Sequence, residues 1–166
     1  GIENYRTIFA NKAFRLAAGN TLRFFGVCVP LLVVLSLIIA VLLAGQKRFT
    51  QILKSFFLLP MAIPVASVVL LWRLLFDDQG LLNHLLHMLS VQTTDWMNTG
   101  ASFYVLVISY IWRNLGYDVV LWMAGLSAIP AALYEAAKVD GATRMQLIWN
   151  ITIPSLLPTY LSLIHI

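Results

Sequence analysis

Apolar residues occur in long blocks along this chain, and short polar segments separate the blocks. The first block covers residues 24–44, the second covers residues 55–76 with Arg73 inside it, and the third covers residues 101–123. A fourth block begins near residue 151 and continues to the end of the chain. An α-helix of about 20 residues rises roughly 30 Å, the thickness of the hydrocarbon layer of a bilayer. The pattern predicts an all-α, polytopic membrane helix bundle with three complete spans and a truncated fourth.

Prolines lie inside the first two blocks. Pro30 is in the first block, and Pro60 and Pro64 are one helical turn apart in the second. Proline removes a hydrogen bond from a helix, but membrane helices tolerate it because neighbouring groups satisfy the freed carbonyl. We expect the second block to be kinked or broken near Pro60 and Pro64.

The composition agrees with a lipid bilayer as the main surroundings of the chain. Hydrophobic residues make up 60% and charged residues only 11%, whereas soluble domains contain about 25% charged residues. The net charge is +4, but the basic residues are scattered singly among apolar runs, which is typical of charges that flank membrane spans. The single cysteine, Cys28, is most simply a small packed hydrophobic residue. We therefore expect no nucleic-acid partner, no metal site and no cofactor on this chain.

The charges between the blocks predict which ends of the spans face the cytoplasm. Residues 45–54 contain three basic residues and no acid, whereas residues 77–100 contain three acids and no base. The positive-inside rule then places residues 45–54 and 124–150 in the cytoplasm and residues 77–100 outside. Four basic residues before the first span disagree, because they would lie outside: Arg6, Lys12, Arg15 and Arg23.

Residues 129–150 carry the most informative pattern in the chain. Pro130 suits the first turn of a helix, and the alanine-rich residues after it favour a helix up to residue 139. Gly141 is expected to end that helix, because glycine adopts the left-handed conformation without a steric penalty. Residues 143–150 predict a second short helix. This cytoplasmic helix-turn-helix has many small residues, which allow another protein surface to approach closely.

Several residues of this segment also occur at a fixed spacing. They are Glu135, Ala136, Ala137, Gly141, Ile151 and Pro154. The spacing resembles the EAA signature of permease subunits of binding-protein-dependent ABC importers. In that signature Glu-Ala-Ala is followed by three residues, glycine, nine residues, isoleucine, one residue, leucine and proline. Ile153 replaces the leucine of the signature.

Other stretches resemble the carbohydrate-importer branch of this family, whose transmembrane domain is MetI-like. They include Asp140-Gly141-Ala142, the string FLLPMAIP at residues 57–64, and Ile111-Trp112 followed by Gly116. The resemblance extends over about residues 5–160. Because the family's domain has additional spans on both sides, we expect this chain to be a fragment.

The resemblance implies a permease subunit of an ATP-driven importer for a sugar or sugar-like solute, in the plasma (inner) membrane of a bacterium or archaeon. Its implied partners are an ATP-binding ABC subunit, a second permease subunit, an extracytoplasmic solute-binding protein and the lipid bilayer. The chain itself is not expected to be an enzyme, because it contains no phosphate-binding GxxxxGK[ST] pattern. The residues implied to contact the ATPase are Glu135, Ala136, Ala137, Asp140, Gly141 and Ala142.

Polar residues in the third block are candidates for the solute path. Arg113 lies past the middle of the block, and ionisable groups at that depth are costly and usually face a cavity or a partner. Asn114 and Asp118 are four residues apart and share a helix face. Amide and carboxylate groups beside aromatic residues suit polyhydroxylated solutes. Alternatively, Arg113 and Asp118 pair with the second permease subunit or extend toward the membrane interface.

Three other functions are compatible with parts of this pattern. A permease of the same superfamily for peptides, amino acids or an inorganic anion would share the EAA spacing. A secondary transporter or channel would have no docking motif of this kind. A membrane enzyme would need a cluster of nucleophile, base and orienting residue, which the sequence does not suggest.

The last six residues, 161–166, read LSLIHI. This string resembles the translation of a transposon-end adaptor used in sequencing libraries. We therefore expect residues 161–166 to be derived from the adaptor and the natural sequence to stop being informative near Tyr160, and we assign no role to His165.

Overall fold

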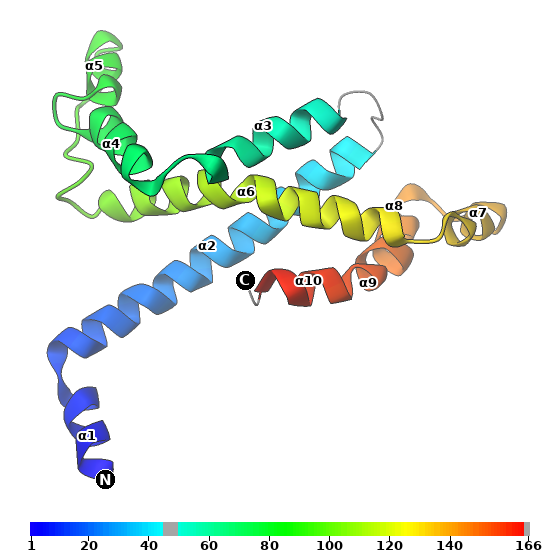
Figure 1. Ribbon diagram of the computed structural model, residues 1–166, viewed down its shortest axis with the longest axis horizontal. Helices are drawn as coiled ribbons and strands as arrows, with labels where there is room; N and C mark the ends of the chain where they lie inside the picture. The colour runs from blue at the N-terminus through cyan, green and yellow to red at the C-terminus, as the bar shows by residue number, and fades with distance from the viewer. Residues whose placement is uncertain (45–49, 165–166) are drawn as a thin grey trace.

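The computed structural model describes the backbone of residues 1–44 and 50–164 and the side chains of residues 1–44 and 55–163. These residues form helices and turns without a strand, which confirms the predicted all-α class (Figure 1). The helices are α1 (Ile2–Ala10), α2 (Lys12–Ala44), α3 (Thr50–Ala62), α4 (Val65–Phe76), α5 (Leu81–Met88), α6 (Ser102–Ala128), α7 (Ala131–Val139), α8 (Arg144–Leu147), the π-helix η1 (Ile148–Thr152), α9 (Ile153–Ser155) and α10 (Leu157–Ile164).

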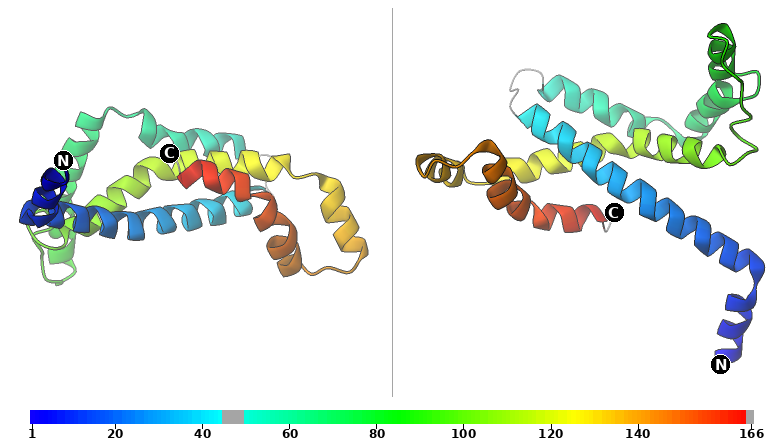
Figure 2. Two further views of the ribbon diagram at one scale, coloured as in Figure 1. Left: turned by 90° about the horizontal axis from the view of Figure 1, so that it is seen from below. Right: turned by 180° about the vertical axis from the view of Figure 1, so that it is seen from behind.

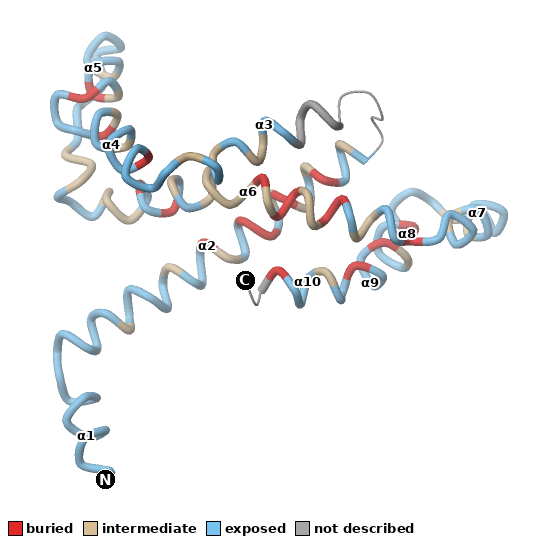
Figure 3. Tube along the Cα trace, viewed as in Figure 1, coloured by how far each residue is buried: buried red, intermediate tan, exposed pale blue. Residues whose placement is uncertain are grey.

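Helix α6 forms the centre of the molecule and packs against both α2 and α3 (Figures 1 and 2). Buried residues concentrate where α2 crosses α6, whereas α1 and α7 are exposed (Figure 3). The main core cluster joins α2, α6 and the C-terminal helices and consists of Val33, Ala40, Val119, Trp122, Met123, Ile129, Leu156 and Leu163. Many apolar residues outside this cluster stay exposed, as expected of helices that face lipid.

Helix α2 begins at Lys12, well before the apolar block predicted at residues 24–44. Residues 12–23 contain alanine, leucine and arginine, which are strong helix formers, so the helix extends beyond the apolar residues. At 33 residues it is about 50 Å long, more than the roughly 30 Å of the hydrocarbon layer. It is the one helix in the described part of the chain that is long and apolar enough to span a membrane alone; counting each bent helix pair as one span gives up to three.

The second block does not form one continuous helix. The chain turns by 96° between Ser55–Ala62 and Val65–Met88, so α3 and α4 point in different directions. The break lies at Ile63 and Pro64, where proline lacks an N–H group and disfavours helical geometry in the residue before it. The expected break is confirmed at Pro64, whereas Pro60 lies within α3.

Glycine allows α6 to approach α3 closely. A Cβ atom on Gly116 would overlap the backbone carbonyl of Phe57 in α3. On another face of α6, a Cβ atom on Gly125 would contact the side chain of Thr159 in α10. Small residues at such positions bring membrane helices into van der Waals contact, which is a main source of their association.

One buried hydrogen bond joins α2 to α6. The indole Nε1 of Trp122 donates to Ser36 Oγ over 3.0 Å, and Ser36 Oγ donates to the carbonyl oxygen of Val33 over 3.0 Å. Trp122 and Ser36 are both buried. Hydrogen bonds between membrane helices contribute about 0.6–2 kcal/mol each, so this bond stabilises the packing of α2 on α6. Because it joins two particular residues, it also fixes how the two helices are aligned along their lengths.

The helices divide the molecule into two ends (Figures 1 and 2). The end of α2, the start of α3, and helices α7 and α8 lie at one end, called here the α7 end. Helices α4 and α5 and the start of α2 lie at the other, called the α5 end. The basic residues used to predict the cytoplasmic side, Lys47, Arg48 and Lys54, lie outside the described side chains. Of the suspected adaptor tail, residues 161–164 continue α10, and residues 165–166 lie outside the described residues.

Candidate coupling site

Helix α7 ends in a tight turn that depends on Gly141. The N–H of Ala142 donates to the carbonyl oxygen of Ala137 over 2.9 Å, and the N–H of Gly141 donates to that of Lys138 over 3.1 Å. This pair of bonds is the Schellman arrangement of a helix C-terminus, which needs a left-handed residue. Gly141 has φ +79°, so the predicted left-handed glycine is confirmed.

The helix after the turn starts with a reciprocal cap. The N–H of Gln146 donates to Thr143 Oγ1 over 3.4 Å, and the N–H of Thr143 donates to Gln146 Oε1 over 2.8 Å. Such a capping box satisfies two N–H groups that have no partner inside the helix. Helix α8 has only four residues and continues as the π-helix η1, instead of the single helix predicted over residues 143–150. Pro154 cannot donate to Asn150, so the chain adopts the wider turn before it.

A pair of side-chain hydrogen bonds fixes α7 against η1. The hydroxyls of Tyr134 and Thr152 are 2.9 Å apart, and Thr152 Oγ1 donates to the carbonyl oxygen of Leu147 over 3.2 Å. Because the Thr152 proton is used on Leu147, Tyr134 is the donor in the first bond. Neither Tyr134 nor Thr152 was predicted from the sequence as a site residue. The signal available was a tyrosine in an alanine-rich helix, whose hydroxyl needs a partner when partly buried.

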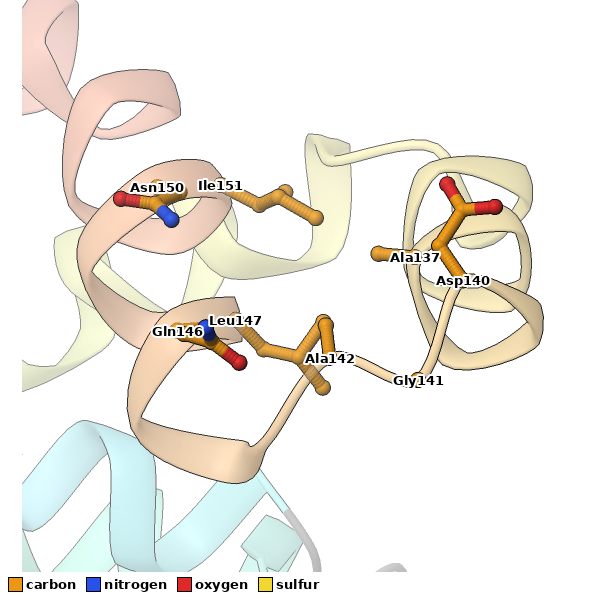
Figure 4. A pocket seen from close by; sticks show the side chains of 8 residues that line it. All are labelled: Ala137, Asp140, Gly141, Ala142, Gln146, Leu147, Asn150 and Ile151. Carbon is orange, nitrogen blue, oxygen red and sulfur yellow. The ribbon is translucent and has the colours of Figure 1, made fainter.

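An open hollow of about 290 Å³ lies between α7 and the α8–η1 segment (Figure 4). Four of the six predicted ATPase-contact residues line it: Ala137, Asp140, Gly141 and Ala142. The opposite wall consists of Gln146, Leu147, Asn150 and Ile151. The other two predicted contact residues, Glu135 and Ala136, are exposed on α7 and do not line the hollow.

Large apolar side chains are exposed around this helix pair. Val139 is 88% exposed, Met145 63% and Trp149 62%. The same segment also carries exposed charges of both signs, on Glu135 and Lys138. Apolar groups gathered on a surface with mixed charge are typical of a protein–protein contact.

The three residues predicted for the solute path do not converge on one point. Asn114 Nδ2 donates to the carbonyl oxygen of Tyr110 in its own helix over 2.8 Å. Asp118 is buried, whereas Arg113 and Asn114 are half-buried. Within residues 1–44 and 55–163, no hydrogen bond or ion pair joins the side chains of Arg113, Asn114 and Asp118. The predicted face shared by Asn114 and Asp118 therefore differs in burial along its length.

Comparison with known proteins identifies the family. A family model described as "Binding-protein-dependent transport system inner membrane component" matches residues 33–166. This chain belongs to that family. It is accordingly a multi-pass protein of the plasma (inner) membrane. The residues that resemble the EAA signature lie in α7, in the turn at Gly141, in η1 and in α9.

Relatives in this family include sugar permeases. The trehalose/maltose transport system permease protein MalF of Thermococcus litoralis is 33% identical over 95% of this chain and 54% of the relative. The xylose/arabinose import permease protein XacH of Haloferax volcanii is 32% identical over 93% of this chain and 50% of the relative. The chain thus spans about half the length of these relatives.

A solved structure has the same fold. It is a bacterial alginate ABC transporter in complex with an alginate pentasaccharide-bound periplasmic protein. The TM-score is 0.86 at 27% identity, over 99% of this chain and 58% of the matched chain.

At the α5 end of this family member, one asparagine organises the loop between α4 and α6. Asn83 Nδ2 donates to the carbonyl oxygens of Thr94 and Asp78, over 2.9 and 3.1 Å. Its Oδ1 accepts from Trp96 Nε1 over 2.9 Å and from the N–H of Thr94 over 3.3 Å. Nearby, the backbone N–H of Asn98 donates to Asp95 and lowers the pKa of that carboxyl. Asn83 is buried, so the loop has a fixed shape.

Proposed function

We propose that this chain forms the core of a permease subunit that imports a sugar or sugar-like solute. Support comes from relatives whose names specify trehalose/maltose and xylose/arabinose, and from the alginate transporter of the same fold. The solute would reach the membrane on a soluble binding protein; the family's description as a binding-protein-dependent transport system supports this part of the proposal. A second permease subunit would complete the path.

We infer further that α7 and the turn at Gly141 dock on a separate ATP-binding subunit, and that ATP is hydrolysed there. The observation that carries this inference is the exposed, rigid helix pair with its hollow and its EAA residues at the α7 end. Helix α6 continues into α7 through a bend of 63°. Ile129, at that bend, belongs to the core cluster with Val119 and Trp122. Movement of α7 would therefore be transmitted to the core, where it shifts the balance between two packed states.

The docking proposal is tested by changing only the backbone preference at Gly141. No atom lies within 4 Å of a Cβ placed there, so a substitution acts through the left-handed φ and not through a clash. A left-handed non-glycine residue costs roughly 1–2 kcal/mol, which is about tenfold in affinity. Gly141→Val should weaken co-purification of the ATPase subunit by about this factor. Gly141→Asn should retain most binding, because asparagine tolerates this conformation. Equal binding by wild type and Gly141→Val would contradict the proposal.

Among the residues proposed for the solute path, Asp118 allows the most direct test of that role. A buried carboxylate in a membrane helix is costly unless it faces a cavity or a partner. Asp118→Asn keeps the shape of the side chain and removes its charge. If Asp118 acts on the solute path, this variant should assemble normally and show reduced solute uptake in proteoliposomes. Normal uptake would remove Asp118 from the proposed path.

A further inference from the structure

Helix α1 has one apolar face and one polar face. The helix belongs neither to the core cluster nor to the coupling site. With 100° between successive residues, Ile2, Tyr5, Ile8 and Phe9 fall on one side of the helix. These side chains are 84%, 67%, 46% and 63% exposed, respectively. The opposite side carries Glu3, Asn4 and Thr7. An exposed apolar face of this kind needs a covering that the described part of the chain does not provide.

The position of α1 suits the surface of a bilayer. The helix lies at the α5 end and runs across the direction of α6, which spans the molecule (Figure 1). The turn between α1 and α2 is capped: Asn11 has an extended backbone, and its Oδ1 accepts from the N–H of Ala13 over 2.8 Å. This cap starts α2 and fixes the change of direction.

Basic residues surround the junction of α1 and α2. The first 15 residues contain one acid, Glu3, and three bases: Arg6, Lys12 and Arg15. Arg15 is held near the end of α1, with Nη2 3.5 Å from the carbonyl oxygen of Ala10. Arg23 is different, because it lies over the ring of Phe103 at 4.2 Å. In the predicted orientation these bases lie outside the cell, where the positive-inside rule does not favour them. Their presence therefore needs a separate explanation.

We propose that α1 lies in the membrane interface at the α5 end, with its apolar face in the acyl boundary and Arg6, Lys12 and Arg15 at anionic lipid headgroups. Short amphipathic helices with aromatic residues on one face and bases beside it bind bilayers in this way. The apolar surface also continues into the spanning helix, since Phe9 packs edge-to-face on Phe14 of α2 with ring centroids 5.5 Å apart.

This placement has a consequence for α2. The helix is longer than the hydrocarbon layer is thick, so it must tilt or project into water. An α1 anchored at the interface holds Lys12 at the headgroups on one side, so the far end of α2 at Ala44 stays at the opposite interface only if α2 tilts. The inclination of α2 to α6 in Figures 1 and 2 agrees with such a tilt.

The proposal is tested by spin labels on the permease reconstituted in nanodiscs, in a Cys28→Ala background. Labels at Tyr5→Cys and Phe9→Cys probe the apolar face, and labels at Asn4→Cys and Thr7→Cys are the matched controls. Oxygen concentrates in lipid, whereas a nickel chelate stays in water. With phosphatidylglycerol present, the ratio of oxygen to nickel accessibility should be severalfold higher on the apolar face than on the polar one.

Each other outcome contradicts part of the proposal. High nickel accessibility at both faces would place α1 in water, and low accessibility to both reagents at Tyr5 and Phe9 would mean that protein covers the face. The headgroup contact predicts that Lys12→Gln with Arg15→Gln, or neutral lipid alone, lowers the ratio at Phe9. An unchanged ratio under both conditions would overturn the role of anionic lipid.

Discussion

Replacing Gly116 with alanine is expected to separate α3 from α6 and to destabilise the permease. The added Cβ would overlap the backbone carbonyl of Phe57, and a backbone atom cannot move aside without shifting α3. Overpacking of this kind costs about 1–3 kcal/mol or more. At about 2–4 °C per kcal/mol for a chain of this length, the loss should lower Tm by roughly 2–12 °C, measured by thermal unfolding in detergent.

The matched control for Gly116→Ala is Gly26→Ala. Gly26 also lies within a long helix, but no atom comes within 4 Å of a Cβ placed there. Alanine has a higher helix propensity than glycine, so this variant should unfold at the same or a slightly higher temperature. Equal losses of Tm in the two variants would show that the Phe57 contact is not what makes Gly116 necessary.

Replacing Asn83 with leucine should open the loop at the α5 end. Leucine has a similar shape but cannot replace the bonds to Thr94, Asp78 and Trp96. Thr94 and Asp78 are exposed and Trp96 is half-buried, so water can reach the groups that lose their partner. At a net of about 0.5–1.5 kcal/mol for each of the four hydrogen bonds, a loss of roughly 2 kcal/mol or more in local stability is expected. Hydrogen exchange should accelerate at the amide of Thr94, while the amides of α7 keep wild-type protection.

Asn98→Leu is the control for Asn83→Leu, because it removes a polar loop residue that takes no part in the hydrogen bonds of Asn83. Asn98 is exposed, and its side chain donates only to Asp95 within the described hydrogen bonds. This variant should leave the amide of Thr94 protected. If Asn83→Leu leaves Thr94 equally protected, the network does not hold the loop.

Features that depend on nearby residues were predictable from the sequence. The left-handed turn at Gly141 follows from the glycine itself, and the break at Pro64 follows from a missing N–H group. The helix pair at residues 129–150 was likewise predictable, although the π-helix before Pro154 was not. The spacing of the EAA signature then distinguished this helix pair from an ordinary loop between two spans.

Features that depend on distant residues were not predictable. Gly116 alone suggests a weak point in a helix, and only the neighbouring backbone of Phe57 shows that it is a packing contact. Similarly, Tyr134 and Thr152 are 18 residues apart, and their hydrogen bond depends on the turn between them. The burial of Asp118 beside half-buried Asn114 depends on which helices pack against α6, and residue spacing along one helix does not determine that packing.

The proposed function requires the bend at the end of α7 to face the cytoplasm and to bind an ATPase subunit. Val139 reports on it directly, since it is 88% exposed and precedes the turn. Val139→Cys in a Cys28→Ala background can be labelled with a membrane-impermeant maleimide in vesicles of known orientation. We expect labelling only in vesicles whose cytoplasmic face is outward, and we expect the added ATPase subunit to protect the cysteine from the maleimide. Labelling from the opposite face, or no protection by the ATPase subunit, would contradict the proposed function.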